Sequence, residues 1–333
     1  MAGNDPTSAS DGPLGVAILG FWHVHADGYA QEAAEHPGTR LVAAWDPDPE
    51  RGREGAARLG VPYEPELAAV LARDDVDGVS VTTATSEHPE VIAAALDAGV
   101  HVFTEKLLAG TEQEAADLLK RAAAQGAALV VSLPRLAEPT TLAAARLLDE
   151  GALGRLTYAR FRMAHDGWIG GWLPERFGDP ATAIGGALAD LGCHPVYLVQ
   201  RFLGAEPERV DASYARVTGR GVEDNAVVTM RYPDGAIGVA EASFVTTPGA
   251  ATFELRGTEG SLLSGFGSEV LLGKGPRLGG DAWTAVALPE PGEAPFALWV
   301  RAMRGAAAAE VEANQRAALE LTRVVVRANT AAL

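Results

Sequence analysis

The first 135 residues alternate between short apolar runs and segments with a helical pattern, and this alternation constrains the fold most. Runs that are apolar at every position are typical of parallel strands buried on both faces. The helical segments between them supply the crossover connections that parallel strands need. We therefore expect a doubly wound α/β domain over residues 14–135. Its five predicted strands are Leu14–Leu19, Leu41–Trp45, Gly78–Thr83, Val100–Thr104 and Ala128–Leu133.

The second half of the chain has longer runs, several of them alternating between apolar and polar residues. They are joined by tight turns such as Pro233-Asp234-Gly235, which is typical of antiparallel strands. We expect an α+β domain with a large open, mainly antiparallel sheet and with Gly185–Leu203 as its main helix. The predicted strands are Leu156–Ala164, Arg209–Thr218, Asn225–Tyr232, Ala236–Val245, Thr252–Arg256 and further runs to about Leu288.

These patterns divide the chain into four parts. Residues 1–13 are predicted to be a disordered leader, because they are rich in Gly, Ser, Asp and Pro and lack the basic and apolar parts of a signal peptide. Residues 14–135 form the predicted dinucleotide-binding domain. Residues 136–313 form the predicted substrate-binding and oligomerisation domain, and 314–333 a C-terminal helix.

Charge and composition exclude several kinds of partner. The net charge of −17 would repel nucleic acids and anionic membranes. The chain has a single cysteine, Cys193, so no disulfide can form within it, and we expect a cytoplasmic protein. No window approaches eighteen uncharged apolar residues, so no membrane span is predicted.

The end of the first strand is the expected cofactor site, because ligands of doubly wound domains bind beyond the carboxyl ends of the strands. The dinucleotide fingerprint of Rossmann domains has glycines at its first, third and sixth positions. Only Gly20 matches, and Trp22 occupies the third position. Asp46 ends the second strand, where a carboxylate can bind the adenosine ribose and repel a 2′-phosphate. This favours NAD over NADP.

Two histidines, His23 and His25, follow the same strand. They are expected to cap the next helix or to border the pyrophosphate. A His-x-His pair also resembles the metal-binding pair of the amidohydrolase barrels. Such a barrel needs eight strand–helix units, which the antiparallel second half does not supply. No metal is therefore expected.

A carboxylate and an imidazole, Asp190 and His194, stand four residues apart in the stretch that begins at Gly185. On a helix they would share one face, and such a pair can serve as a general acid/base. Lys106 follows the fourth predicted strand. A lysine at a strand's carboxyl end faces the ligand crevice, where an ammonium could stabilise a developing alkoxide.

Taken together, these motifs resemble the glucose–fructose oxidoreductase/inositol dehydrogenase (Gfo/Idh/MocA) family over nearly the whole chain. The fourth strand of that family ends in Glu-Lys-Pro, here Glu105-Lys106-Leu107. Residues 76–83 of this chain, with His88 after them, resemble the third strand of the family and the residues that follow it. Its catalytic helix has the pattern Gly-Gly-Gly-x-x-x-Asp-x-Gly-x-His. This chain matches that pattern at Gly185, Gly186, Asp190, Gly192 and His194.

The resemblance implies a role for each matching residue. Lys106 would contact the substrate oxygen near the nicotinamide, His194 would be the general acid/base, and Asp190 would orient His194 or bind substrate. Three positions depart from the family: Trp22 in the fingerprint, Leu107 in place of proline, and Tyr197 where sugar-acting members often have an acid. The implied cofactor-binding residues are Gly20, Trp22, His23, His25, Asp46, Thr83, His88 and Glu105.

A loop rich in glycine and aromatic residues follows the first strand of the second domain. Its residues His165, Trp168 and Trp172 are candidates for covering a substrate pocket, and an oligomer contact is the alternative. Arg135 and Arg162 are further candidate substrate anchors.

The favoured function is an NAD-dependent oxidoreductase that transfers hydride between nicotinamide and a secondary alcohol or ketone, such as a sugar or cyclic polyol. Two alternatives are a glycoside hydrolase that uses bound NAD for transient oxidation, and a non-catalytic dinucleotide sensor. The expected partner is a small-molecule substrate. The open sheet is a usual oligomer surface in this family, which implies a homodimer or homotetramer.

Overall fold

The computed structural model describes residues 12–267 and 269–332, and the chain divides into two compact units. The first unit extends to Glu105 and includes Asp117–Ser132 and Pro295–Gln315; the second comprises Lys106–Ala116, Leu133–Ala294 and the chain from Arg316. The predicted leader, residues 1–13, lies outside the described residues except for its last two. Among the described residues, the structure contains no helix that is both long and apolar enough to cross a membrane.

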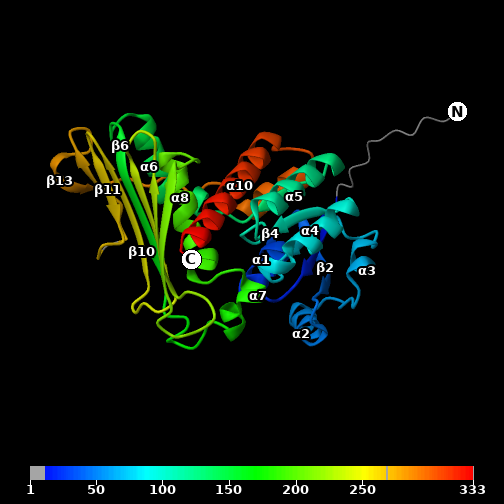
Figure 1. The fold of residues 1–333 in the computed structure, drawn as a ribbon. Helices are drawn as coiled ribbons and strands as arrows, with labels where there is room; N and C mark the ends of the chain where they lie inside the picture. Colours follow the sequence, from blue (N-terminus) through cyan, green and yellow to red (C-terminus); the bar gives the residue numbers. More distant parts are fainter. Residues whose placement is uncertain (1–11, 268, 333) are drawn as a thin grey trace. The chain divides into compact units, whose positions relative to one another are not determined.

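The first unit is built on a parallel sheet with the strand order β2-β1-β3-β4-β5. This confirms the predicted doubly wound domain. Figure 1 labels two of these strands, β2 and β4. The order reverses direction between β1 and β3, so their carboxyl ends form the switch point where such domains bind ligands. The strands are β1 Leu14–Leu19, β2 Thr39–Trp45, β3 Gly78–Val81, β4 His101–Thr104 and β5 Leu129–Val131.

Helices connect these strands and complete the core of the first unit. They are α1 Ala26–Glu35, α2 Pro49–Leu59, α3 Leu67–Leu71, η1 Thr85–Glu87, α4 His88–Asp97, α5 Glu112–Gln125 and α9 Pro295–Met303. α9 lies far along the chain, in the range predicted for the second domain, yet it packs on this unit. Its Phe296 and Trp299 lie 5.4 and 5.8 Å from the ring of Phe103 on β4. Burial of these rings joins α9 to the first core.

The second unit contains an open sheet of eight strands in the order β13-β12-β11-β10-β6-β9-β8-β7. All neighbouring pairs are antiparallel except β6 and β9, which run parallel. The prediction of a mainly antiparallel sheet is therefore confirmed. The strands are β6 Leu156–Ala164, β7 Arg209–Ala215, β8 Asn225–Arg231, β9 Ile237–Ser243, β10 Ala250–Gly257, β11 Ser261–Ser264, β12 Leu272–Gly275 and β13 Gly280–Ala285.

Several helices belong to or enter the second unit: η2 Pro134–Ala137, α6 Pro139–Asp149, η3 Glu175–Gly178, α7 Pro180–Ala183, η4 Leu188–Gly192, α8 Cys193–Leu203 and α10 Ala308–Ala331. α8 lies across the sheet, with Phe202 stacked 5.9 Å from Phe161 of β6. The predicted C-terminal helix begins at Ala308, earlier than expected.

The single predicted helix over 185–203 is wrong in detail, because η4 is a π-helical turn and α8 starts after it. Pro195 has no N–H group with which to bond the carbonyl of Leu191, so the α-helical ladder is interrupted there. Turns of this kind occur frequently at functional sites.

Candidate active site

Lys106 and Asp190 form an ion pair inside the second unit, with 3.1 Å between Lys106 Nζ and Asp190 Oδ1. The lysine side chain is only 2% exposed, whereas that of Asp190 is 20% exposed. The carboxylate therefore fixes a nearly buried ammonium and remains accessible on one side. An ammonium has three N–H donors, so Lys106 can donate to Asp190 and also to a substrate oxygen.

His194 lies on the first turn of α8 and is buried. Its Nδ1 atom lies 2.8 Å from the hydroxyl oxygen of Tyr197, which also accepts a hydrogen bond of 3.1 Å from the Arg135 backbone N–H. This arrangement turns Nδ1 toward Tyr197. Burial raises the pKa of Tyr197 well above its usual value, so the partner of His194 is a neutral phenol.

Glu223 holds the start of the helical segment that carries Asp190 and His194. Its buried carboxylate accepts hydrogen bonds of 3.0 Å from the backbone N–H groups of Gly186 and Leu188. A Cβ atom at Gly186 would lie 2.0 Å from the Glu223 carbonyl oxygen, so only glycine fits there. Burial raises the pKa of Glu223, and the backbone N–H donors oppose that rise.

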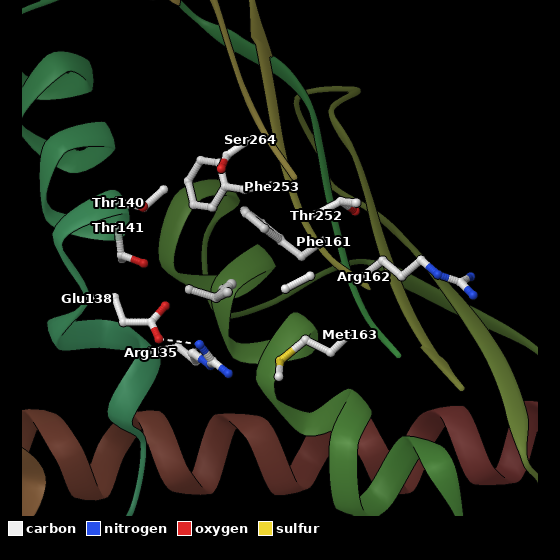
Figure 2. A pocket seen from close by; sticks show the side chains of 12 residues that line it. Arg135, Glu138, Thr140, Thr141, Phe161, Arg162, Met163, Thr252, Phe253 and Ser264 are labelled. Carbon is white, nitrogen blue, oxygen red and sulfur yellow. Dashed lines mark hydrogen bonds and ion pairs between the residues drawn. The ribbon is translucent and has the colours of Figure 1, made fainter. Parts of the chain in front are cut away.

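Arg135 and Arg162, the two candidate substrate anchors, do not point to the same place. Both line a cavity of about 120 Å³ between α6 and the sheet. Figure 2 shows Arg135 facing Glu138, with which it forms an ion pair, while Arg162 points away. The Arg162 guanidinium instead contacts Glu241 at 3.4 Å and donates to Thr246 Oγ1 at 3.1 Å. Arg162 lies on β6 and Arg135 on η2, so the two guanidinium groups come from different elements.

The aromatic loop after β6 is held by stacking rather than lying open. His165 stacks on Phe244 with 5.0 Å between ring centroids, and Trp168 is buried against the same ring. Trp172 is 53% exposed and donates from Nε1 to Asp166. Burial lowers the pKa of His165, and the negative charge of Asp190 partly offsets this. Of the three predicted residues, Trp172 is therefore the most exposed to a ligand.

The loop after β1 is tied into the switch point of the first unit. Gly20 has a φ of +94°, and a Cβ atom there would lie 2.5 Å from the backbone nitrogen of Thr83. The Oγ1 atom of Thr83 is buried without a hydrogen-bond partner within the described residues. Trp22 is buried, and the His23 N–H group donates to the Thr82 carbonyl at 3.0 Å. An unpaired buried hydroxyl at this edge fits the binding of a polar dinucleotide.

Asp46 is more fully engaged than the sequence suggests. Its carboxylate, which has no exposed side-chain area, accepts hydrogen bonds from the Phe21 N–H group at 2.6 Å and the Asp48 N–H group at 2.8 Å. Arg51 donates to both carboxylate oxygens, from Nε at 2.8 Å and from Nη2 at 2.6 Å. Four donors fill the sites of one carboxylate. A ribose hydroxyl can reach Asp46 only if Arg51 moves.

Glu105 and His88 complete the predicted cofactor residues, and both are buried. His88 is the first residue of α4. Glu105 follows β4 and lies 2.6 Å from His25 Nδ1; it is also hydrogen-bonded to the hydroxyl of Tyr29. Burial, followed by the charge of Glu105, raises the pKa of Tyr29 well above its usual value.

Comparison with known families agrees with both halves of this description. Residues 14–133 match the oxidoreductase family with an NAD-binding Rossmann fold, and residues 141–263 match the GFO/IDH/MocA C-terminal domain. Together the two matches cover more than half of the chain. The chain belongs to the Gfo/Idh/MocA family of oxidoreductases. It is accordingly an NAD(P)-binding dehydrogenase or reductase, which excludes the sensor alternative.

Several Gfo/Idh/MocA relatives resemble the chain over most of its length. The scyllo-inositol 2-dehydrogenase (NAD(+)) of Bacillus subtilis is 28% identical over 76% of this chain and 72% of its own. The D-xylose 1-dehydrogenase (NADP(+)) 2 of Haloferax volcanii is 30% identical over 75% and 74%. The crystal structure of GenD2 from gentamicin A biosynthesis, in complex with NAD, has a TM-score of 0.79 at 27% identity and covers 99% of this chain and 97% of that chain.

Within this Gfo/Idh/MocA chain, two structural residues of the site were missed or undervalued by the sequence reasoning. Glu223 carries no local motif that connects it to Gly186, because the two are far apart in sequence. Tyr197 was noted only as a departure from the family. Its position three residues after His194, on the same helical face, was the available signal for its contact with the imidazole.

Proposed function

We propose that this chain is an NAD-dependent oxidoreductase that interconverts a secondary alcohol and a ketone on a sugar or cyclic polyol. The observation that carries the proposal is the pair formed by Lys106 and Asp190 beside a helix that presents His194. Relatives named for scyllo-inositol and D-xylose support the substrate class. The bound nicotinamide would accept or supply the hydride.

In the oxidative direction, His194 takes the hydroxyl proton at Nε2. Lys106 donates a hydrogen bond to the same oxygen, which stabilises the charge that develops there. Tyr197 can donate to Nδ1 or accept from it, so the imidazole keeps its orientation in either protonation state. Because this partner is neutral, it orients the ring without the added proton affinity that a carboxylate would give. General acid/base catalysis of this kind contributes roughly 10²–10⁴ in rate.

The preference for NAD rests on the charges at the end of β2. A cavity of about 360 Å³ there is lined by Asp46 and by Glu66, Glu87 and Glu90. Arg51 forms an ion pair with Asp46, so these two charges cancel. The three glutamates then leave the lining net negative. Such a lining repels the 2′-phosphate of NADP. The preference therefore depends on the whole pocket more than on a direct bond from Asp46 to the ribose.

Fluorescence titration tests the cofactor, and steady-state assays on a panel of sugars and cyclic polyols test the reaction. NADH should bind more tightly than NADPH, and tighter binding of NADPH would refute the cofactor proposal. The His194→Ala variant should lose turnover but keep its affinity for NADH; near wild-type turnover would refute the role of His194. Glycoside cleavage without net reduction of NAD would favour the hydrolase alternative.

A further inference from the structure

Three potential metal ligands meet at the switch-point edge of the first unit. His23 and His25 come from the loop between β1 and α1, and Glu105 follows β4. Their ligating atoms all lie within 4.8 Å of one another. All three are among the residues expected to bind the dinucleotide, and the reaction proposed above has no step that needs a metal at them.

The spacing of these atoms suits one small cation. Zinc bonds to histidine nitrogen and carboxylate oxygen are about 2.0–2.2 Å long, which places two ligands of a tetrahedral ion roughly 3.4 Å apart. Glu105 Oε1 lies 2.6 Å from His25 Nδ1 and 3.8 Å from His23 Nδ1. These distances fall on either side of that value. His23 Nδ1 accepts a hydrogen bond of 3.2 Å from the His25 backbone N–H group, so metal binding through this atom requires that hydrogen bond to break. Rotations of the His23 and His25 side chains would then bring the three atoms into range.

Burial and hydrogen bonding also favour a built site over a chance grouping. The Glu105 and His23 side chains are 1% and 5% exposed, whereas His25 is 48% exposed and leaves a path for an ion to enter. The Tyr29 hydroxyl is hydrogen-bonded to Glu105 and lies 2.8 Å from Ser132 Oγ. Metal-binding carboxylates are usually held by such an outer layer of hydrogen bonds.

The local charges permit a cation at this place. The N-terminus of α1, where His25 is the capping residue, carries a partial positive charge that opposes a cation. A carboxylate that binds a metal carries a full negative charge, and Glu105 would contact the ion directly, so its attraction would exceed the effect of the helix N-terminus. Two neutral imidazoles and one carboxylate form a ligand set typical of zinc and similar transition metals.

We propose that His23, His25 and Glu105 form a binding site for one divalent transition metal cation of the Zn²⁺ class. The three side chains supply three ligands and leave a fourth position for water. The site discriminates against Mg²⁺, because Mg²⁺ prefers oxygen ligands in octahedral geometry. This inference concerns metal binding by the protein without dinucleotide, so it stands or falls separately from the proposed reaction.

The test is isothermal titration of chelator-treated, tag-free protein with ZnCl₂ and, separately, MgCl₂. The variants are His25→Ala, at a half-exposed position that tolerates truncation, and Glu105→Gln, which keeps the side-chain shape. His36→Ala is the matched control, because it removes a histidine of the same unit that lies outside the group. Circular dichroism confirms that each variant is folded.

Wild type and His36→Ala should bind one Zn²⁺ per chain, and Mg²⁺ should bind far more weakly. Each ligand variant should weaken Zn²⁺ binding at least about tenfold. Absence of saturable Zn²⁺ binding, or equal affinity in wild type and both ligand variants, would overturn the proposal. Failure of NADH binding would instead count against the proposed function and leave these outcomes unchanged.

Discussion

The Lys106–Asp190 pair gives the sharpest test of the site as the structure describes it. The Asp190→Asn variant removes the carboxylate charge that pairs with the Lys106 ammonium, whose side chain is 2% exposed. Breaking a buried ion pair from one side typically destabilises a protein by about 3–5 kcal/mol. The asparagine carbonyl can still accept a hydrogen bond from the ammonium, which is worth about 1.5–3 kcal/mol. We expect a net loss of about 2 kcal/mol in the free energy of unfolding.

Urea unfolding followed by tryptophan fluorescence measures this loss, with each transition of the two-unit chain fitted separately. The matched control is Asp27→Asn. Asp27 pairs with Arg58 at the similar distance of 2.9 Å, but both side chains are more than half exposed. Exposed pairs contribute only about 0–1 kcal/mol, so this variant should be nearly neutral.

The double variant Lys106→Met/Asp190→Asn separates charge from packing. It removes the buried ammonium together with the carboxylate charge, so it should recover much of the stability lost by Asp190→Asn. If Asp190→Asn is no less stable than Asp27→Asn, or if the double variant is less stable than the single one, the argument that Asp190 compensates a buried charge is wrong.

Three further predictions follow from individual contacts. Tyr197→Phe should lower kcat by up to about 10²-fold, because His194 loses the hydroxyl that fixes its ring; an unchanged kcat in steady-state assays would exclude this role. Burial raises the pKa of Glu223, so wild type should lose stability as pH rises from the unfolded pKa of about 4.3 toward the raised value. Urea unfolding should show no such loss in Glu223→Gln, and parallel pH profiles would contradict this. Thr83→Val should raise the Kd for NADH about 2- to 12-fold, the equivalent of one hydrogen bond of about 0.5–1.5 kcal/mol, with unfolding by urea unchanged; equal Kd values would exclude Thr83 from the cofactor site.

Local sequence patterns were sufficient to predict much of the fold. The alternation of apolar runs and helical segments predicted the parallel sheet of the first unit, because burial on both faces demands apolar residues throughout each strand. Alternating runs with tight turns predicted the mainly antiparallel sheet. The pattern could not place α9, since its contact with Phe103 joins residues nearly 200 positions apart. The pattern also did not predict the π-helical turn η4, because that turn depends on where Pro195 interrupts the hydrogen bonds of the helix.

For the site, the sequence by itself identified which residue types carry the chemistry: Lys106 after a strand, and Asp190 and His194 four residues apart. Only the tertiary structure paired Lys106 with Asp190, which lies 84 positions away in the sequence. Tyr197 and Arg51 are local partners, three and five residues from His194 and Asp46. The reason is physical: a motif records spacing along one element, whereas a partner is set by where the fold brings two elements together.

The same distinction applies to the loop after β1. From the sequence, His23 and His25 were expected to cap the next helix or to border the pyrophosphate, and no metal was expected. The fold ends β1 and β4 at the same edge of the sheet, which places Glu105 within reach of both imidazoles. Parallel strands bring their carboxyl ends together whatever the distance along the chain. The sequence therefore determined the ligand types, and the order of the strands decided that they meet.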